Sequence, residues 1–227
     1  MRNLVILSGA GVSAESGINT FRDAGGLWEG HDVMEVASPT GWHKNPGLVL
    51  DFYNQRRSQL KIVKPNLAHD IIAQLQDKYN VQVVTQNVDD LHERAGSKHV
   101  LHLHGELLKS RSVAREDLVY TCDDDINLGD MAEDGAQLRP HIVWFGEEVP
   151  LLAQAASKVQ QADVLIIIGT SLLVYPAAGL HGYAPSTCKK YLVDLQPNLD
   201  MIDPEKIEVI QDSATQGMSY LNSLLRR

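Results

Sequence analysis

Three short apolar runs rich in β-branched residues constrain the fold of this 227-residue chain most strongly. They occupy residues 4–7, 81–84 and 164–168, and each has the length and composition of a strand buried on both faces. Longer stretches with helical spacing lie between and after them, at residues 46–60, 67–79, 151–161 and 215–225. This alternation predicts an α/β fold with a mostly parallel sheet and helices on both faces.

Weaker strand patterns occur at residues 99–103, 142–145 and 191–195. Between residues 109 and 138 the hydrophobicity falls and acidic residues accumulate. We interpret this segment as a small insertion module, with a hairpin near residues 110–121, inside one domain that covers residues 1–227.

Charge and cysteine content exclude several classes of protein. The formal net charge is -9, whereas a nonspecific nucleic-acid binder carries a basic patch, so we expect no nucleic-acid partner. The apolar runs are too short for a signal peptide or a membrane helix, so no membrane association is expected. Two cysteines suit a reducing compartment, and we expect a cytoplasmic monomer.

A glycine-rich turn directly follows the first apolar run. Gly9, Gly11 and Ala14 fit the pattern G-x-G-x-x-G/A of Rossmann-like folds, in which glycine lets the backbone approach a pyrophosphate beside a helix N-terminus. Such glycines also occur in strand–helix turns that bind nothing. No acidic strand end follows at about 20 residues, and residues 15–23 are too polar and glycine-broken for a long crossover helix. A hydride-transferring dehydrogenase is therefore a poor fit.

Five blocks of residues, in order along almost the whole chain, resemble the signatures of the sirtuin family. The blocks are residues 9–28, 85–96, 103–105, 139–147 and 169–178. Within that family the chain resembles the bacterial class III type. The resemblance implies an enzyme that consumes NAD to remove acyl groups from lysine side chains of proteins or peptides, giving nicotinamide and O-acyl-ADP-ribose.

The resemblance assigns the general base to His104. In the implied reaction the acyl oxygen attacks the ribose carbon that bears nicotinamide, and the base then activates a ribose hydroxyl. An imidazole suits this task because its unperturbed pKa lies near neutral pH. His102 lies on the same face of the predicted strand but has no third ligand for a metal, so we predict that it packs.

The NAD-binding residues implied by the resemblance lie mainly in the glycine turn and at strand ends. They are Gly9, Ala10, Gly11, Ser13, Ala14, Ile18, Phe21, Arg22, Trp28, Gln86, Asn87, Asp89, Gly169, Thr170, Ser171, Asp194, Gln196 and Ala214. Asn87 and Asp89 could also cap a helix that starts near Asp90. Asp194 stands where many relatives have Asn-x-Glu, so it can accept bonds from ribose hydroxyls but lacks the amide donor.

Tyr53 and Arg56 are three residues apart in a predicted helix and so project from one face. Arginine offers a planar fork for a carboxylate, and tyrosine adds a hydroxyl. The pair resembles the Tyr-x-x-Arg of sirtuins that prefer acidic acyl groups, although a solvated helix face has the same spacing. We predict desuccinylation or demalonylation, with weaker deacetylation. The implied substrate-binding residues are Ala24, Tyr53, Arg56, Val143, Phe145, Gly146, Glu147 and Val174.

Most sirtuins hold a structural zinc with four cysteines, and this chain has two. Ser112 stands about where the first thiolate is expected, and Cys122 is alone in the insertion. We therefore predict no metal.

Two other classes of function remain open. An NAD glycohydrolase or protein ADP-ribosyltransferase could use the same nucleotide site, but neither reaction needs the Tyr53–Arg56 pair. The second alternative is a non-catalytic NAD-binding module, but such a module needs no general base at His104.

Overall fold

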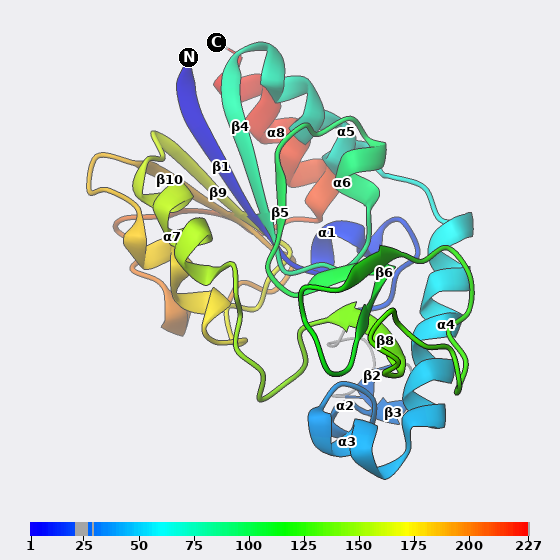
Figure 1. The fold of residues 1–227 in the computed structure, drawn as a ribbon. Coiled ribbons are helices and arrows are strands. Elements are labelled where there is room, and N and C mark those ends of the chain that lie inside the picture. Colours follow the sequence, from blue (N-terminus) through cyan, green and yellow to red (C-terminus); the bar gives the residue numbers. More distant parts are fainter. Residues whose placement is uncertain (21–26, 29, 227) are drawn as a thin grey trace.

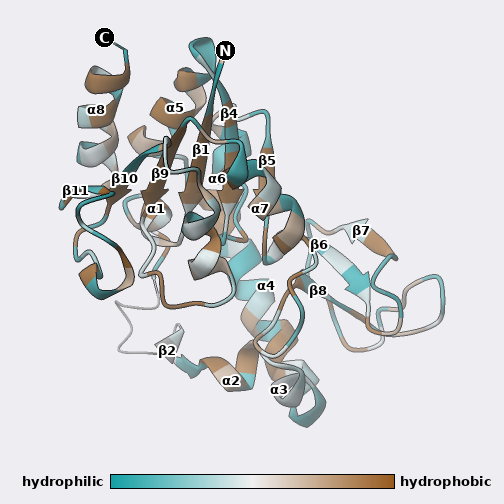
Figure 2. Cartoon of the chain, turned by 90° about the vertical axis from the view of Figure 1, so that its left-hand side faces the viewer, coloured by the Kyte–Doolittle hydropathy of each residue, from teal (hydrophilic) through white to brown (hydrophobic). Residues whose placement is uncertain are grey.

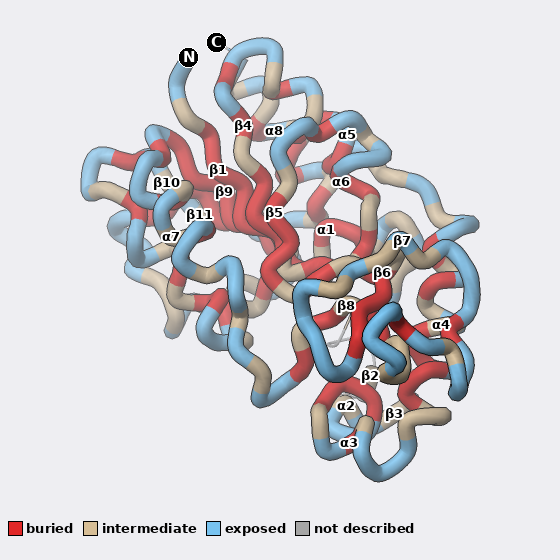
Figure 3. Tube along the Cα trace, in the orientation of Figure 1, coloured by how far each residue is buried: buried red, intermediate tan, exposed pale blue. Residues whose placement is uncertain are grey.

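The computed structural model describes residues 1–20, 27–28 and 30–226, without the side chain of residue 27 (Figure 1). Its main element is a six-stranded sheet in the order β11-β10-β9-β1-β4-β5, in which all pairings are parallel. The strands are β1 (Arg2–Ser8), β4 (Tyr79–Thr85), β5 (Val100–His102), β9 (Val164–Ile168), β10 (Lys189–Val193) and β11 (Glu208–Ile210). The central strands are buried along most of their length (Figure 3).

Helices cover both faces of this sheet, as the sequence predicts. Leu4 and Ile6 pack with α5 (Leu67–Gln74) and α8 (Ala214–Leu225) on one face. Val5 and Leu7 pack on the other face with α7 (Leu152–Gln160) and η2 (Ala177–Tyr183). Since successive side chains of a strand point to opposite faces, one apolar run supplies both cores. The central strands are the most apolar part of the ribbon (Figure 2).

A second, smaller lobe has its own core and lies below the carboxyl ends of the central strands in Figure 1. Its helices are α2 (Val33–Val36), α3 (Pro39–Lys44) and α4 (Pro46–Ile62), beside a short pair, β2 (Leu27–Trp28) and β3 (His31–Asp32). An antiparallel sheet completes it, in the order β7-β6-β8, formed by β6 (Gly105–Ser112), β7 (Val119–Thr121) and β8 (Leu138–Ile142). The β6–β7 pairing confirms the predicted hairpin.

Two predicted elements differ most from the structure in their bounds. The helix predicted to reach Tyr79 ends at Gln74, and after a turn of 3-10 helix, η1 (Leu75–Asp77), Tyr79 already starts β4. The strand predicted at residues 142–145 lies earlier, because β8 ends at Ile142. Trp144 is apolar and buried, but it belongs to a loop that packs into the core of the smaller lobe.

No helix in the described part of the chain is both long enough and apolar enough to cross a bilayer.

Candidate functional site

Three polar segments meet where β1, β4 and β9 end. Ser8 at the end of β1 is in register with Thr85 of β4 and with Ile168 of β9. The chain pairs β1 with β4 on one side and with β9 on the other, so the strand order reverses here. Ligands of open parallel sheets bind at such a reversal, beyond the carboxyl ends of the strands.

The glycine turn after β1 packs directly on the turn after β9. The amide nitrogen of Gly11 lies 2.8 Å from the carbonyl oxygen of Gly169. A Cβ on Gly9 would stand 2.7 Å from the same oxygen, and Gly169 itself has φ +62. These glycines are therefore required for backbone packing, whatever else they contact. The helix that follows, α1 (Gly11–Ala14), is one turn long, which agrees with the absence of a long crossover helix.

Ser13 joins two of the predicted cofactor residues inside the protein. Its buried hydroxyl donates to Oδ2 of Asp89 at 3.0 Å and accepts from Nδ2 of Asn87 at 3.2 Å. The other carboxylate oxygen of Asp89 accepts the amide of Leu91 at 3.1 Å, at the start of α6 (Leu91–Arg94). Asp89 therefore bonds the first amide of α6 from the position before the N-cap, Asp90, whose own side chain forms no capping bond. Burial raises the pKa of the Asp89 carboxyl.

His69 was not foreseen as part of this site. Asn66 donates its backbone N–H to Nδ1 of His69 in the capping box of α5, so the ring proton resides on Nε2 and is donated to Ser13 at 3.4 Å. Burial lowers the pKa of His69 to about 4, which keeps this tautomer neutral. The sequence signal for this role of His69 is an Asn-x-x-His spacing at a helix start. In the usual capping box the residue three positions after the N-cap is Glu or Gln, and here it is histidine.

His104 lies in the turn between β5 and β6 and is held by the loop after β4. Its Nδ1 lies 3.1 Å from the carbonyl oxygen of Gln86. A carbonyl can only accept, so Nδ1 carries the proton and Nε2 keeps its lone pair. Burial lowers the pKa of His104 below the ordinary value of 6.5, which favours the neutral ring. Gly105, with φ +84, lets the chain turn at once, since a Cβ there would collide with the carbonyl oxygen of His141.

His102 has a polar role rather than the packing role predicted for it. Its Nδ1 lies 2.9 Å from the carbonyl oxygen of Asn87, and its Nε2 lies 2.7 Å from Oε1 of Glu93. Burial lowers the pKa of His102, but the hydrogen bond and charge of Glu93 outweigh burial, and the pKa is raised. The two histidines therefore hold consecutive carbonyl groups of the loop after β4.

The remaining predicted cofactor residues lie along the same edge of the sheet. Gln86 donates from Nε2 to Oγ1 of Thr170 at 3.0 Å, which joins the loop after β4 to the turn after β9. Asp194 follows β10 and accepts the amide of Gln196 at 2.8 Å. Ala214 is the first residue of α8. Phe21, Arg22 and Ala24 lie outside the described residues.

A pocket between α4 and the loop after β4 contains both Tyr53 and Arg56. Its walls are formed by Ile18, Asn19, Trp28, Tyr53, Arg56, Gln59, Leu60, Val88, Asp89 and Leu107. The predicted acyl-binding pair therefore shares one pocket with Asp89, Trp28 and Ile18 from the predicted cofactor set. The side chains of Tyr53 and Arg56 do not form a solvated helix face, since Tyr53 is completely buried and Arg56 is half-buried.

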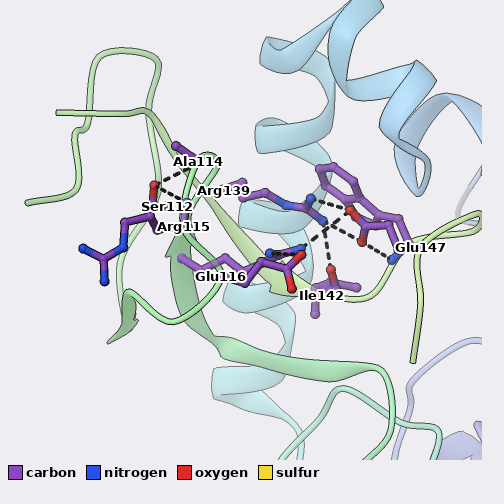
Figure 4. A network of polar contacts seen from close by, with 9 residues as sticks. Ser112, Ala114, Arg115, Glu116, Arg139, Ile142 and Glu147 are labelled. Carbon is purple, nitrogen blue, oxygen red and sulfur yellow. Dashed lines mark hydrogen bonds and ion pairs between the residues drawn. The ribbon is translucent and has the colours of Figure 1, made fainter. Parts of the chain in front are cut away.

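The other predicted substrate residues come from the loop after β8 and the segment after β9. Val143 donates its amide to the carbonyl oxygen of His104 at 2.9 Å, which brings this loop to the base. Phe145 and Gly146 are exposed, and Val174 is partly buried. Glu147 instead bonds within the protein: its carboxylate pairs with Arg139 at 2.7 and 3.2 Å and accepts the amide of Trp144 at 2.8 Å (Figure 4).

In the antiparallel sheet of the smaller lobe, Ser112 lies at the position where the resemblance places a first thiolate. Its hydroxyl accepts the amides of Ala114 and Arg115 (Figure 4). The same hydroxyl donates to Oδ2 of Asp134 at 2.7 Å. The thiol of Cys122 lies 3.3 Å from the carbonyl oxygen of Asp124. Within the described ranges, no three His, Cys, Asp or Glu side chains gather in a way that could hold a metal. A four-thiolate zinc needs four cysteines and this chain has two, so the residues present do not fit that site.

A doubly wound parallel sheet with a glycine turn and buried polar side chains at the strand-order reversal defines a nucleotide-binding α/β protein. Residues 9–176 match the model of the Sir2 family, and the chain belongs to that family of enzymes.

Relatives and solved structures agree along nearly the whole chain. An NAD-dependent protein deacylase of Helicobacter pylori strain J99 is 61% identical over 97% of this chain and 94% of its own length. One from Bacteroides thetaiotaomicron is 51% identical over 99% and 98%. A Sir2 homologue in complex with NAD has a TM-score of 0.87 at 36% identity, covering 99% of this chain and 89% of that one. A Sir2 protein bound to an acetylated peptide has a TM-score of 0.81 at 30% identity, with coverage of 99% and 94%.

Proposed function

We propose that this chain is an NAD-dependent protein-lysine deacylase that prefers succinyl and malonyl groups and removes acetyl groups more weakly. The products are the free lysine, nicotinamide and O-acyl-ADP-ribose. The relatives' shared name and the NAD-bound neighbour support the NAD-dependent deacylase activity. The observation that carries the acyl preference is that Tyr53 and Arg56 line one pocket with Asp89.

The donors and acceptors at the strand-order reversal suit a dinucleotide. We assign NAD to the glycine turn after β1, to Ser13, Gln86, Asn87 and Asp89, and to the turn after β9. Bound NAD supplies the electrophilic ribose carbon on which the acyl oxygen acts. Asn87 and Asp89 are held in place for it by Ser13 and by the ring of His102.

His104 is the general base of the proposed reaction. Its Nδ1 proton is held by the carbonyl of Gln86, and among the described residues Nε2 makes no hydrogen bond. The Nε2 lone pair is thus the group that takes a proton from a ribose hydroxyl. Burial favours the neutral ring, so the base is competent at neutral pH.

Tyr53 and Arg56 are the proposed recognition elements for the acyl carboxylate. A guanidinium and a neutral phenol both donate hydrogen bonds, and a carboxylate accepts them. Burial raises the pKa of Tyr53, so its hydroxyl remains protonated. An acetyl group has no carboxylate to use these donors, which explains the proposed order of preference.

We also propose that the module at residues 109–138 folds without zinc. Two contacts support this proposal: the Ser112–Asp134 bond within the module, and the side chain of Asn54 on α4, which exchanges hydrogen bonds with both backbone groups of Ile126 at 3.0 Å. The two cysteines are both free, which suits the cytoplasm. Because the chain has a net charge of -9, we propose acyl-lysine proteins rather than nucleic acid as its partners. The proposed oligomeric state is a monomer.

The test is to incubate the purified protein with NAD and a succinyl-lysine peptide and to analyse the products by mass spectrometry. Loss of the succinyl group only when NAD is present supports the proposal. Release of nicotinamide with an unchanged peptide would instead identify an NAD glycohydrolase. ADP-ribose attached to a protein would identify a transferase.

A further inference from the structure

We propose that Trp144 is a positioning residue for acyl selectivity, because its indole N–H sets the direction in which Tyr53 donates its hydroxyl proton. This inference rests on the proposed function and adds a residue to it. Trp144 does not line the acyl pocket, so its effect must pass through Tyr53.

The argument begins with the bond between the two side chains. Nε1 of Trp144 lies 3.0 Å from the hydroxyl oxygen of Tyr53, and both residues are buried. An indole N–H is a donor only, so the phenol oxygen must accept this bond. Its own proton then points elsewhere, and within the described part of the chain no group accepts it. A carboxylate bound beside Arg56 in the pocket is a suitable acceptor.

Trp144 is itself held on three sides, which makes it a rigid donor. The guanidinium of Arg139 stacks on its ring at 3.2 Å from the centroid, and the ring of Trp42 lies 5.7 Å away. Its backbone amide donates to Oε2 of Glu147 at 2.8 Å. The indole therefore cannot turn away from Tyr53 without losing its contacts with Arg139 and Trp42.

The ion pairs behind Trp144 tie it to the antiparallel sheet. Glu147 forms a two-pronged bond with Arg139 of β8 and an ion pair with Arg111 of β6 at 3.6 Å (Figure 4). Burial raises the pKa of Glu147, but the bonds from Arg139 and Trp144 and the charges of Arg139 and Arg111 outweigh it, and the pKa is lowered. The carboxylate thus stays charged and keeps Arg139 on the indole ring.

The experiment is a double-mutant cycle with Trp144→Phe and Tyr53→Phe, assayed on succinyl-lysine and acetyl-lysine versions of one peptide. Trp144→Phe keeps an aromatic ring but removes the N–H. We expect KM for the succinyl peptide to rise about fivefold, as for one lost hydrogen bond, with less than about a twofold change for the acetyl peptide. In the Tyr53→Phe background the same change should have almost no further effect on the succinyl peptide.

Trp42→Phe is the matched control, because Trp42 touches the same ring but makes no bond to Tyr53. It should leave the ratio of the two activities unaltered. If Trp144→Phe does not fold, benzothienylalanine at position 144 replaces the N–H with sulfur in a ring of the same shape, and the same loss is expected.

Equal losses on both peptides, or an undiminished effect in the Tyr53→Phe background, would overturn this inference while the proposed function stands. A wild-type protein that removes no succinyl group would overturn both.

Discussion

Nδ1 of His104 lies 3.1 Å from the carbonyl oxygen of Gln86, and this one contact fixes which nitrogen of the proposed base is free. Gln86 also reaches Thr170 in the turn after β9. The base is therefore positioned by the segment that we assign to NAD, and the orientation of the ring is coupled to the shape of the nucleotide site.

Replacement of His104 by Ala should abolish turnover of every acyl group, because no other described side chain offers a neutral imidazole nitrogen at this place. We expect a loss of at least about 100-fold in kcat, as for a missing general base. Steady-state assays on succinyl and acetyl peptides measure it. Substantial activity of this variant on either peptide would remove His104 from the reaction.

The pH dependence of kcat/KM follows from the same residue, because kcat/KM reports the titration of groups in the free enzyme. Since burial lowers the pKa of His104 below 6.5, the neutral base persists as the pH falls through 6.5. The acidic limb of the profile should therefore lie below pH 6.5 and should be common to both acyl groups. An acidic limb well above that value would contradict the buried environment found for the ring.

Arg56→Met should damage desuccinylation far more than deacetylation. The change keeps an unbranched apolar stem but removes the charge and the donors, and a hydrogen bond to a charged group contributes about 1.5–3 kcal/mol. The expected loss in kcat/KM for the succinyl peptide is about 10-fold to 100-fold. Gln55→Met is the control, because Gln55 is exposed on the same helix and, among the described residues, its side chain bonds only Asp51. Equal losses on both peptides would exclude the clamp.

Stability should fall as the pH drops from about 6.5 to 4, because of His69. Its pKa is about 4 when folded and 6.5 unperturbed, so the unfolded chain binds more protons in this window. The free energy of unfolding lost through His69 is on the order of 3 kcal/mol by pH 4, and this loss is absent above about pH 7. Denaturant titrations at several pH values measure it. His69→Gln preserves a capping box and should flatten the slope, whereas an unaltered slope would show that His69 does not titrate in this way.

Treatment with a metal chelator should not alter the stability of the protein. We expect a chelator to leave Tm unchanged, and a fall of several degrees would contradict the metal-free module. Ser112→Ala should instead lower the free energy of unfolding by about 1–3 kcal/mol, because three hydrogen bonds converge on that hydroxyl.

The sheet was predictable because β1 and β9 contain unbroken apolar runs and β4 has three valines around Gln82. The bounds of the helices and strands were less predictable where a residue type suits two environments. Tyr79 continues a helical pattern yet pairs with Arg2 at the start of β4. Trp144 is apolar like a strand residue yet is buried from a loop.

The residues of the site also fall into two groups, those that the sequence predicts and those that it does not. His104, Gln86 and Asn87 stand at strand ends and in recognisable motifs, so sequence alone singles them out. His69 and Trp144 act on Ser13 and Tyr53, which are 56 and 91 residues distant in the sequence. Their roles depend on hydrogen bonds that only the folded chain creates, and no local spacing reveals those partners.

The most direct test of the account is a competition in one reaction between a succinyl-lysine peptide and the same peptide carrying acetyl-lysine, at equal concentration with NAD. Both peptides yield the same free-lysine product, so the ratio of O-succinyl-ADP-ribose to O-acetyl-ADP-ribose formed early in the reaction is measured. This ratio gives the ratio of kcat/KM values without a separate enzyme concentration. We predict that succinyl is removed first, and that Arg56→Met reverses the order. Preferential loss of acetyl by the wild-type protein would contradict the account.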